Sequence, residues 1–139
     1  MSLEMLLILE KSRVPDIGVL QSAVDSLGVE VVLDSALNLI SSSGFSPASV
    51  KGHSSGFEIA SSQLESVLPT YPQLKSRVGD RDWAISLHWG GSMGECACVL
   101  GVSLALVKIC DAVAYYPPDE MFCEADGLSK DLQACLQEV

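Results

Sequence analysis

The amino-acid sequence predicts a single α+β domain over residues 1–139, and three observations support this fold class. A chain of 139 residues can bury about two thirds of its unfolded surface without disulfides or a metal. Short apolar or alternating runs, typical of strands, are interspersed with runs of helical periodicity. Between Trp83 and Pro118, a predicted strand, a turn, an almost wholly apolar helix and a second strand follow one another, as expected at the centre of a core.

The beginning of the chain predicts a strand, a helix and a strand. Residues 3–9 form a short apolar run, and residues 12–16 carry helix-start signals, including a proline suited to a first helical turn. Apolar residues at intervals of three and four then predict an amphipathic helix that Gly28 ends. These apolar residues are Ile17, Leu20, Val24 and Leu27. Residues 29–33 are a β-branched run and predict the second strand.

The middle of the chain is less regular. Residues 34–56 are rich in Ser, Gly and Pro, so we expect a loop and a hairpin there, and the sequence leaves their fold open. Residues 56–60 predict a strand. Ser62 and Glu65 match a capping box, in which each side chain satisfies a backbone N–H of the other. A short helix is therefore expected before the prolines and charged residues of 69–82, which predict an irregular connection.

The last part of the chain supplies the central elements. Residues 83–89 alternate as a strand, and residues 112–116 predict another. Between them, residues 96–110 are apolar on every face and predict a core helix. A terminal helix is expected through residues 128–136, with Ser129 as its N-cap. The order of elements contains two β-α-β halves around one sheet, which indicates a ferredoxin-like sandwich with an additional strand and a terminal helix.

Charge and targeting signals limit the partners and the compartment. A net charge of −10 argues against binding nucleic acid or an anionic membrane surface, and favours a basic protein partner. We expect no export signal at the start of the sequence, because Glu4 and Glu10 bracket only five apolar residues. The apolar segment 96–110 has 15 residues, fewer than the roughly 20 that span a bilayer, and contains Lys108. We therefore expect a cytoplasmic protein outside the membrane.

The cysteines and glycines do not match a metal or cofactor motif. Five cysteines are an odd number, and three lie in the apolar helix, which suits free thiols in a reducing compartment. Cys96 and Cys98 have the wrong spacing for a zinc site, and no second pair follows. Residues 90–94 lack the patterns of phosphate- and dinucleotide-binding loops. The sequence predicts no metal and no cofactor.

One pair of residues could carry catalysis. Folding could bring His88, in its strand, near Cys96 at the start of the helix, as base and nucleophile. Such a site also needs an orienting acid, for which Glu95 is the only nearby candidate, and an oxyanion hole. Because these roles are unfilled, we expect no enzymatic activity, a strand role for His88 and a packing role for Cys96.

Aromatic and acidic residues near the end of the last predicted central strand suggest a partner-binding surface. Trp89, Tyr116, Asp119 and Glu120 are the expected contacts. Aromatic side chains supply rigid contact area, and carboxylates steer a basic partner. The alternative is a strand with one aromatic residue inside and one outside, followed by a solvated acidic loop.

Four short motifs between residues 56 and 118 occur in order along the chain. They are Gly-Phe-Glu at 56–58, Leu-His-Trp-Gly-Gly at 87–91, Glu95 with the Ala/Leu-rich helix after it, and Ala-Tyr-Tyr-Pro at 114–117. Together they resemble small bacterial immunity proteins, the cytoplasmic partners of toxins delivered by contact-dependent or type VI secretion. This resemblance implies a non-enzymatic, high-affinity inhibitor and leaves the toxin and its activity unidentified.

Two other functions stay open. An acidic secretion chaperone of similar size would act as a dimer and hold an extended effector segment, but such chaperones usually open with a helix, whereas this chain opens with a predicted strand. A hydrolase would use His88 and Cys96. The oligomeric state, including a homodimer, and the position of the interface are also open.

Overall fold

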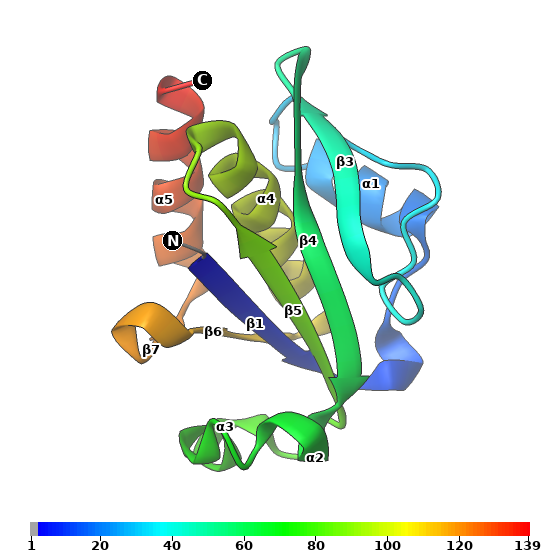
Figure 1. Ribbon diagram of the computed structural model, residues 1–139, viewed down its shortest axis with the longest axis vertical. Helices are drawn as coiled ribbons and strands as arrows, with labels where there is room; N and C mark the ends of the chain where they lie inside the picture. The colour runs from blue at the N-terminus through cyan, green and yellow to red at the C-terminus, as the bar shows by residue number, and fades with distance from the viewer. Residues whose placement is uncertain (1–2) are drawn as a thin grey trace.

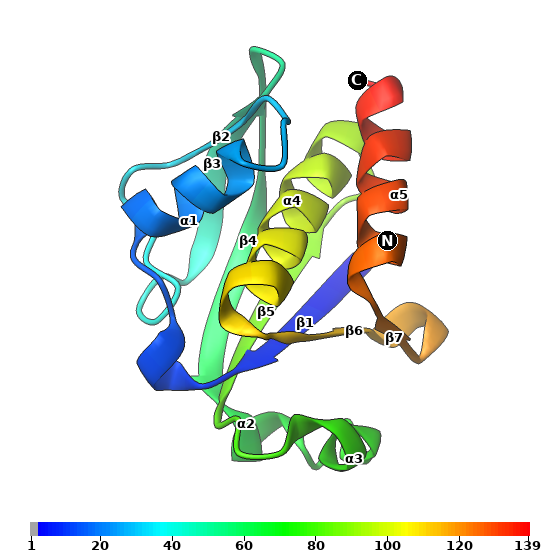
Figure 2. The same ribbon diagram turned by 180° about the vertical axis from the view of Figure 1, so that it is seen from behind.

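A computed structural model describes residues 3–139 as one seven-stranded antiparallel sheet with helices on both of its faces (Figures 1 and 2). The strands are β1 (Leu3–Leu9), β2 (Val31–Leu33), β3 (Gly44–Val50), β4 (His53–Gln63), β5 (Trp83–Trp89), β6 (Val113–Tyr116) and β7 (Met121–Cys123). The α-helices are α1 (Ile17–Asp25), α2 (Leu64–Val67), α3 (Lys75–Val78), α4 (Met93–Cys110) and α5 (Ala125–Gln137). Single 3-10 turns occupy Lys11–Arg13, Pro72–Leu74 and Pro117–Asp119. The predicted α+β class is confirmed.

The strand order is β2-β3-β4-β5-β1-β6-β7, and every neighbouring pair is antiparallel. Strands β5 and β6 both flank β1, so they run parallel to each other with one strand between them, and α4 connects them. This is the split β-α-β unit of a ferredoxin-like sandwich. The first half, β1-α1-β2, is wider because the β3–β4 hairpin is inserted between β5 and β2.

The inserted hairpin accounts for the segment whose fold the sequence left open. Strand β3 contains Pro47, which cannot donate to a ladder and argues against a strand. In the structure β2 pairs only with residues 48–50 of β3, so Pro47 lies beyond the end of β2 and beside a locally open edge. Strand β4 is also longer than the predicted 56–60 run, because β3 and β5 pair along it. The short strand β7 was not predicted.

Two helix starts differ from the predictions. Ser62 lies in the ladder between β4 and β5, and Gln63 precedes α2 without a side-chain cap, so the predicted capping box with Glu65 is wrong. The prediction of Ser129 as N-cap is also wrong, since α5 begins at Ala125 after Glu124. In both cases strand pairing or an earlier turn took precedence over a local side-chain motif.

Helix α1 begins directly after the predicted helix-start residues, but Pro15 precedes the N-cap Asp16 instead of lying in the first turn. Asp16 caps α1, and its Oδ1 accepts a hydrogen bond from the backbone N–H of Val19 at 2.9 Å. Ser92 caps α4 by accepting from the N–H of Glu95 at 3.1 Å. Gln21 of α1 then fixes β2, donating to the Val31 carbonyl and accepting from the N–H of Leu33, each at 2.8 Å. The two Gln21 bonds tie α1 to β2.

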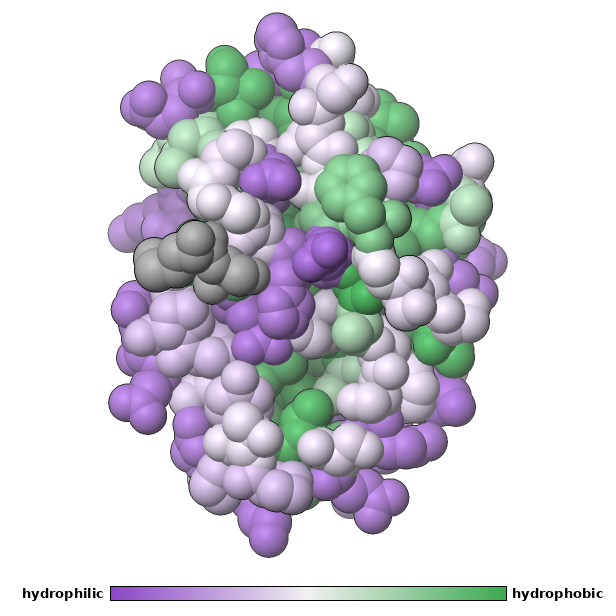
Figure 3. All heavy atoms as spheres, viewed as in Figure 1, coloured by the Kyte–Doolittle hydropathy of each residue, from purple (hydrophilic) through white to green (hydrophobic). Residues whose placement is uncertain are grey.

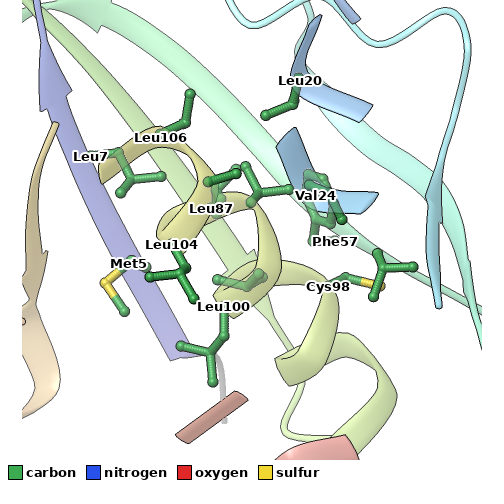
Figure 4. Packing of buried hydrophobic residues seen from close by; sticks show 14 of the residues in the cluster. Met5, Leu7, Leu20, Val24, Phe57, Leu87, Cys98, Leu100, Leu104 and Leu106 are labelled. Atoms are coloured by element: carbon green, nitrogen blue, oxygen red, sulfur yellow. The ribbon is translucent and has the colours of Figure 1, made fainter. Parts of the chain in front are cut away.

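The main core lies between that face and helices α1, α4 and α5. Helix α4 is buried along most of its length, with eleven buried residues and with α1 and α5 beside it. Figure 4 shows side chains from β1, α1, β4 and β5 directed toward α4. By length and composition α4 could cross a membrane, but most of the helix is buried inside the domain. The predicted core helix is confirmed.

A smaller core lies on the opposite face. Alternation along β1 sends Leu7 and Leu9 to the main core and Leu6 and Ile8 to this second cluster. Helices α2 and α3 and the turn between them cover only one end of this face, the lower end in Figure 1. No helix covers the remainder of this face among the described residues.

Candidate functional site

A groove of about 300 Å³ lies where the ends of β5 and β6 meet α4, α5 and the β7 turn. We call it the Trp89 groove. It is lined by Leu3, Met5, Trp89, Cys96, Leu100, Tyr116, Asp119, Met121, Cys123, Leu128, Asp131, Ala134 and Cys135. Most of these side chains are apolar, with two carboxylates and three thiols among them. Strand β7 contributes Met121 and Cys123 to this lining, and the first turn of α5 contributes Leu128.

Two stacked aromatic rings form part of the groove. Trp89 ends β5 and Tyr116 ends β6, so both side chains lie on the helix-covered face, 6.2 Å apart between ring centroids with 30° between the planes. Trp89 is only 6 % exposed, whereas Tyr116 is half-buried. Within residues 3–139 the buried indole N–H of Trp89 has no hydrogen-bond partner. Trp89 therefore belongs to the wall of the groove rather than to a projecting edge.

The carboxylates come from two separate elements. Asp119 belongs to the turn before β7, and Asp131 lies in α5. Neither has an ion-pair partner among the described residues. Glu120, the neighbour of Asp119, is exposed at a positive φ of 49° and does not line the groove. The structure thus brings Trp89, Tyr116 and Asp119 together, and places Glu120 beside them in solvent.

Titrating groups in the groove share the field of these acids. Burial raises the pKa of the Tyr116 hydroxyl, and Asp119 raises it further. Burial likewise raises the pKa of the Cys123 thiol, with contributions from Asp131, Glu124 and Asp119. Both neutral forms are favoured mainly by burial and further by the negative charge of these acids.

Helices α4 and α5 are joined by a pair of thiols at the groove. Cys135 donates to Cys96, with 2.9 Å between the two sulfur atoms. Burial and this neighbour raise the pKa of Cys96 well above its ordinary value. A nucleophilic cysteine needs a lowered pKa. The structure therefore gives Cys96 a packing role, as expected, and shows no activated thiol at this position.

His88 lies on the opposite face of the sheet from Cys96. Alternation along β5 sends Trp89 to the groove and His88 to the open face, where its Nε2 lies 3.2 Å from Glu4 Oε2 and 2.7 Å from Ser86 Oγ. Ser86 also donates to Glu4, and the Tyr71 hydroxyl donates to the second oxygen of Glu4 at 3.0 Å. The pairing of His88 with Cys96 that a hydrolase would need is not formed.

This open-face cluster is not arranged as a catalytic triad. In a triad one imidazole nitrogen faces the hydroxyl and the other faces the acid, whereas here Ser86 and Glu4 both contact Nε2 of His88. Glu58 of β4 lies across from His88 on the other side, and Phe45 of β3 lies across from Glu58. Figure 3 shows this face, with hydrophobic and hydrophilic residues side by side over the middle of the sheet.

Sequence reasoning missed Asp131 and the contribution of the thiols to the groove. Asp131 is one of several acids in a terminal helix, and no local spacing separates it from Asp126 or Glu138. Its position depends on how α5 packs against α4. Only the apolar stripe of α5, which fixes the side of the helix that is buried, could have given a signal.

No family model matches the chain, and no curated protein or solved structure matches it either.

Proposed function

We propose that this chain is a non-enzymatic, acidic immunity protein that binds and neutralises a cognate bacterial toxin in the cytoplasm. The observation that supports this most is the Trp89 groove, in which two carboxylates without ion-pair partners border a stacked aromatic pair and an apolar floor. Aromatic residues in desolvated pockets are the usual anchors of tight protein interfaces. The four motifs that resemble immunity proteins agree with this function, since two of them contain Trp89 and Tyr116.

Charge indicates the kind of partner. With a net charge of −10, the protein attracts a basic surface over a distance of about 10 Å at ordinary ionic strength. Asp119 and Glu120 are both exposed beside the groove, so they can guide a basic toxin onto it. Tyr116, half-buried and stacked on Trp89, is placed to hold the partner once it is bound.

Co-expression with the toxin candidate from the neighbouring gene tests the function. Cells carrying both proteins should survive, and cells carrying the toxin alone should die. Equal death in both cultures contradicts the immunity function for that pair. A partner held in an extended, uninhibited state would instead support the secretion chaperone.

Binding kinetics test the surface. The double substitution Asp119→Lys with Glu120→Lys should slow association, most strongly at low salt, because it reverses the local field. The matched control is Glu30→Lys with Glu65→Lys, which changes the net charge equally at exposed positions outside the groove. Tyr116→Ala should mainly speed dissociation. Unchanged kinetics in all groove variants would place the interface elsewhere.

A further inference from the structure

The Trp89 groove combines three features that a single chemical group would satisfy. Asp119 and Asp131 reach it from different elements, and neither has a cationic partner in the described chain. Both carboxylates also act on the same thiol, Cys123, so their fields overlap inside the groove. An occupant with a positive charge would therefore be attracted from two sides.

The walls favour a cation with an apolar or planar body. The stacked rings of Trp89 and Tyr116 attract a cation over their faces, and this attraction is stronger where water is excluded. Met5, Leu100 and Leu128 supply an apolar surface along which a methylene chain can lie. A volume of about 300 Å³ admits one long side chain but not a helix, which measures about 10–12 Å across with its side chains.

The indole N–H of Trp89 supplies a signal that can report binding in the groove. Buried donors are nearly always paired, yet within residues 3–139 this one has no acceptor although Trp89 is 94 % buried, being 6 % exposed. The N–H of Trp83, by contrast, donates to the Leu39 carbonyl at 3.4 Å. The two indole N–H groups therefore have different surroundings, and only Trp89 of the two tryptophans lines the groove.

We infer that the Trp89 groove receives an arginine side chain from the partner, with the guanidinium held by Asp119 and Asp131, the stem along the apolar floor and the ring of Tyr116 against its plane. This inference rests on the proposed function and names the group that the toxin presents. Arginine suits the groove better than lysine, because its guanidinium is planar, stacks on aromatic rings, bridges two carboxylates and is less strongly hydrated.

The probe is N-acetyl-arginine amide, which carries the guanidinium and two carbonyls, titrated into the ¹⁵N-labelled protein. The two indole N–H signals report binding, and Trp89→Phe assigns them. We expect a saturable shift of the Trp89 signal and a constant Trp83 signal. Asp131→Asn should weaken binding about tenfold. Asp126→Asn, on an exposed acid of the same helix outside the groove, should leave binding unchanged.

One neutral analogue and one cationic analogue complete the test. N-acetyl-citrulline amide has the same shape without the charge and should not bind. N-acetyl-lysine amide should bind several-fold more weakly than the arginine probe. A constant Trp89 signal with the arginine probe overturns the inference, as does equal binding of the citrulline or lysine analogue. An unchanged Trp83 signal in each variant shows that the fold is intact.

The inference and the proposed function can fail separately. If the arginine probe binds but no toxin is neutralised, the groove is an arginine site and the immunity function is wrong. If the toxin is neutralised while the probe does not bind and Asp131→Asn leaves the toxin kinetics unchanged, the function stands and the arginine site is wrong.

Discussion

At the residue scale, Leu104 represents the packing on which α4 depends. It is 2 % exposed and faces side chains from β1, whereas Ile109 on the same helix is 40 % exposed. Leu104→Ala should lower the free energy of unfolding by about 2–5 kcal/mol, through lost burial and the cavity that remains. Urea denaturation measures this. Ile109→Ala is the control and should change stability by less than about 0.5 kcal/mol. Similar effects at both positions would contradict the core assignment of α4.

The burial of the Cys98 thiol makes the free energy of unfolding depend on pH. Burial in the main core raises the pKa of its thiol to about 11. Above about pH 9 the unfolded chain loses this proton while the folded protein keeps it, so stability is complete below that pH and falls as the pH rises toward 11. Cys98→Ala removes this contribution, and the wild type should lose about 2 kcal/mol more than the variant between pH 8 and pH 10.5.

The comparison isolates one thiol. The other thiols and the tyrosine hydroxyls are present in both proteins, so their contributions cancel in the comparison. Urea denaturation at the two pH values gives the difference. Parallel pH profiles for the wild type and Cys98→Ala would show that Cys98 ionises as easily in the folded state as in the unfolded state.

At the element scale, hydrophobic pattern predicted the strands and helices that pack against each other, but not those that depend on pairing. Strands β1, β5 and β6 and helices α1 and α4 have apolar patterns strong enough to be recognised locally. Strand β3 is half polar and contains Pro47, and it exists because β4 and β2 pair with it. Local sequence does not report such pairing.

Gly56 shows how closely β3 and β4 approach each other. Its φ is +152°, and a Cβ there would lie 2.4 Å from Cζ of Phe45 and 2.5 Å from the carbonyl oxygen of Ser46. Gly56→Ala should therefore destabilise the protein by about 1–3 kcal/mol, because the neighbouring backbone has to move. Gly127→Ala is the contrasting control: in α5 a Cβ meets nothing within 4 Å, so stability should rise by about 0.5 kcal/mol or more.

Both glycine variants can be measured by guanidinium denaturation under one set of conditions. A neutral Gly56→Ala would mean that β3 can shift away from β4 at little cost. That result would make the inserted hairpin a loosely held part of the sheet rather than a fixed one.

At the scale of the whole molecule, the candidate site exists only because distant segments meet. Trp89 and Tyr116 were predicted because each ends a recognisable strand, and β1 between those strands brings the two rings within stacking distance. Asp119 follows from the acidic turn after Tyr116. Asp131, Cys123 and Cys135 arrive from β7 and α5, whose packing is not encoded in local spacing. Residue types near strand ends were therefore predictable, and the groove was not.

The two cores also determine how the molecule should respond to reductant and chelator. A chain of this length buries enough apolar surface to fold without cross-links. All five cysteines are free thiols, and residues 3–139 hold no group of three or more His, Cys, Asp or Glu side chains suited to a metal ion. Neither a phosphine reductant nor EDTA should therefore lower the melting temperature, as measured by differential scanning calorimetry.

The Cys96–Cys135 pair gives this prediction its sharpest control. The two sulfurs lie 2.9 Å apart and share the one thiol–thiol hydrogen bond among residues 3–139, so a cross-link between α4 and α5 would form here first. A fall of many degrees on adding reductant, absent in Cys135→Ser, would show that the purified protein carries this cross-link and relies on it. The same fall in both proteins would implicate another pair, and a fall with EDTA would reveal a metal. Equal melting temperatures under all conditions would leave the apolar packing of the two cores as the source of stability.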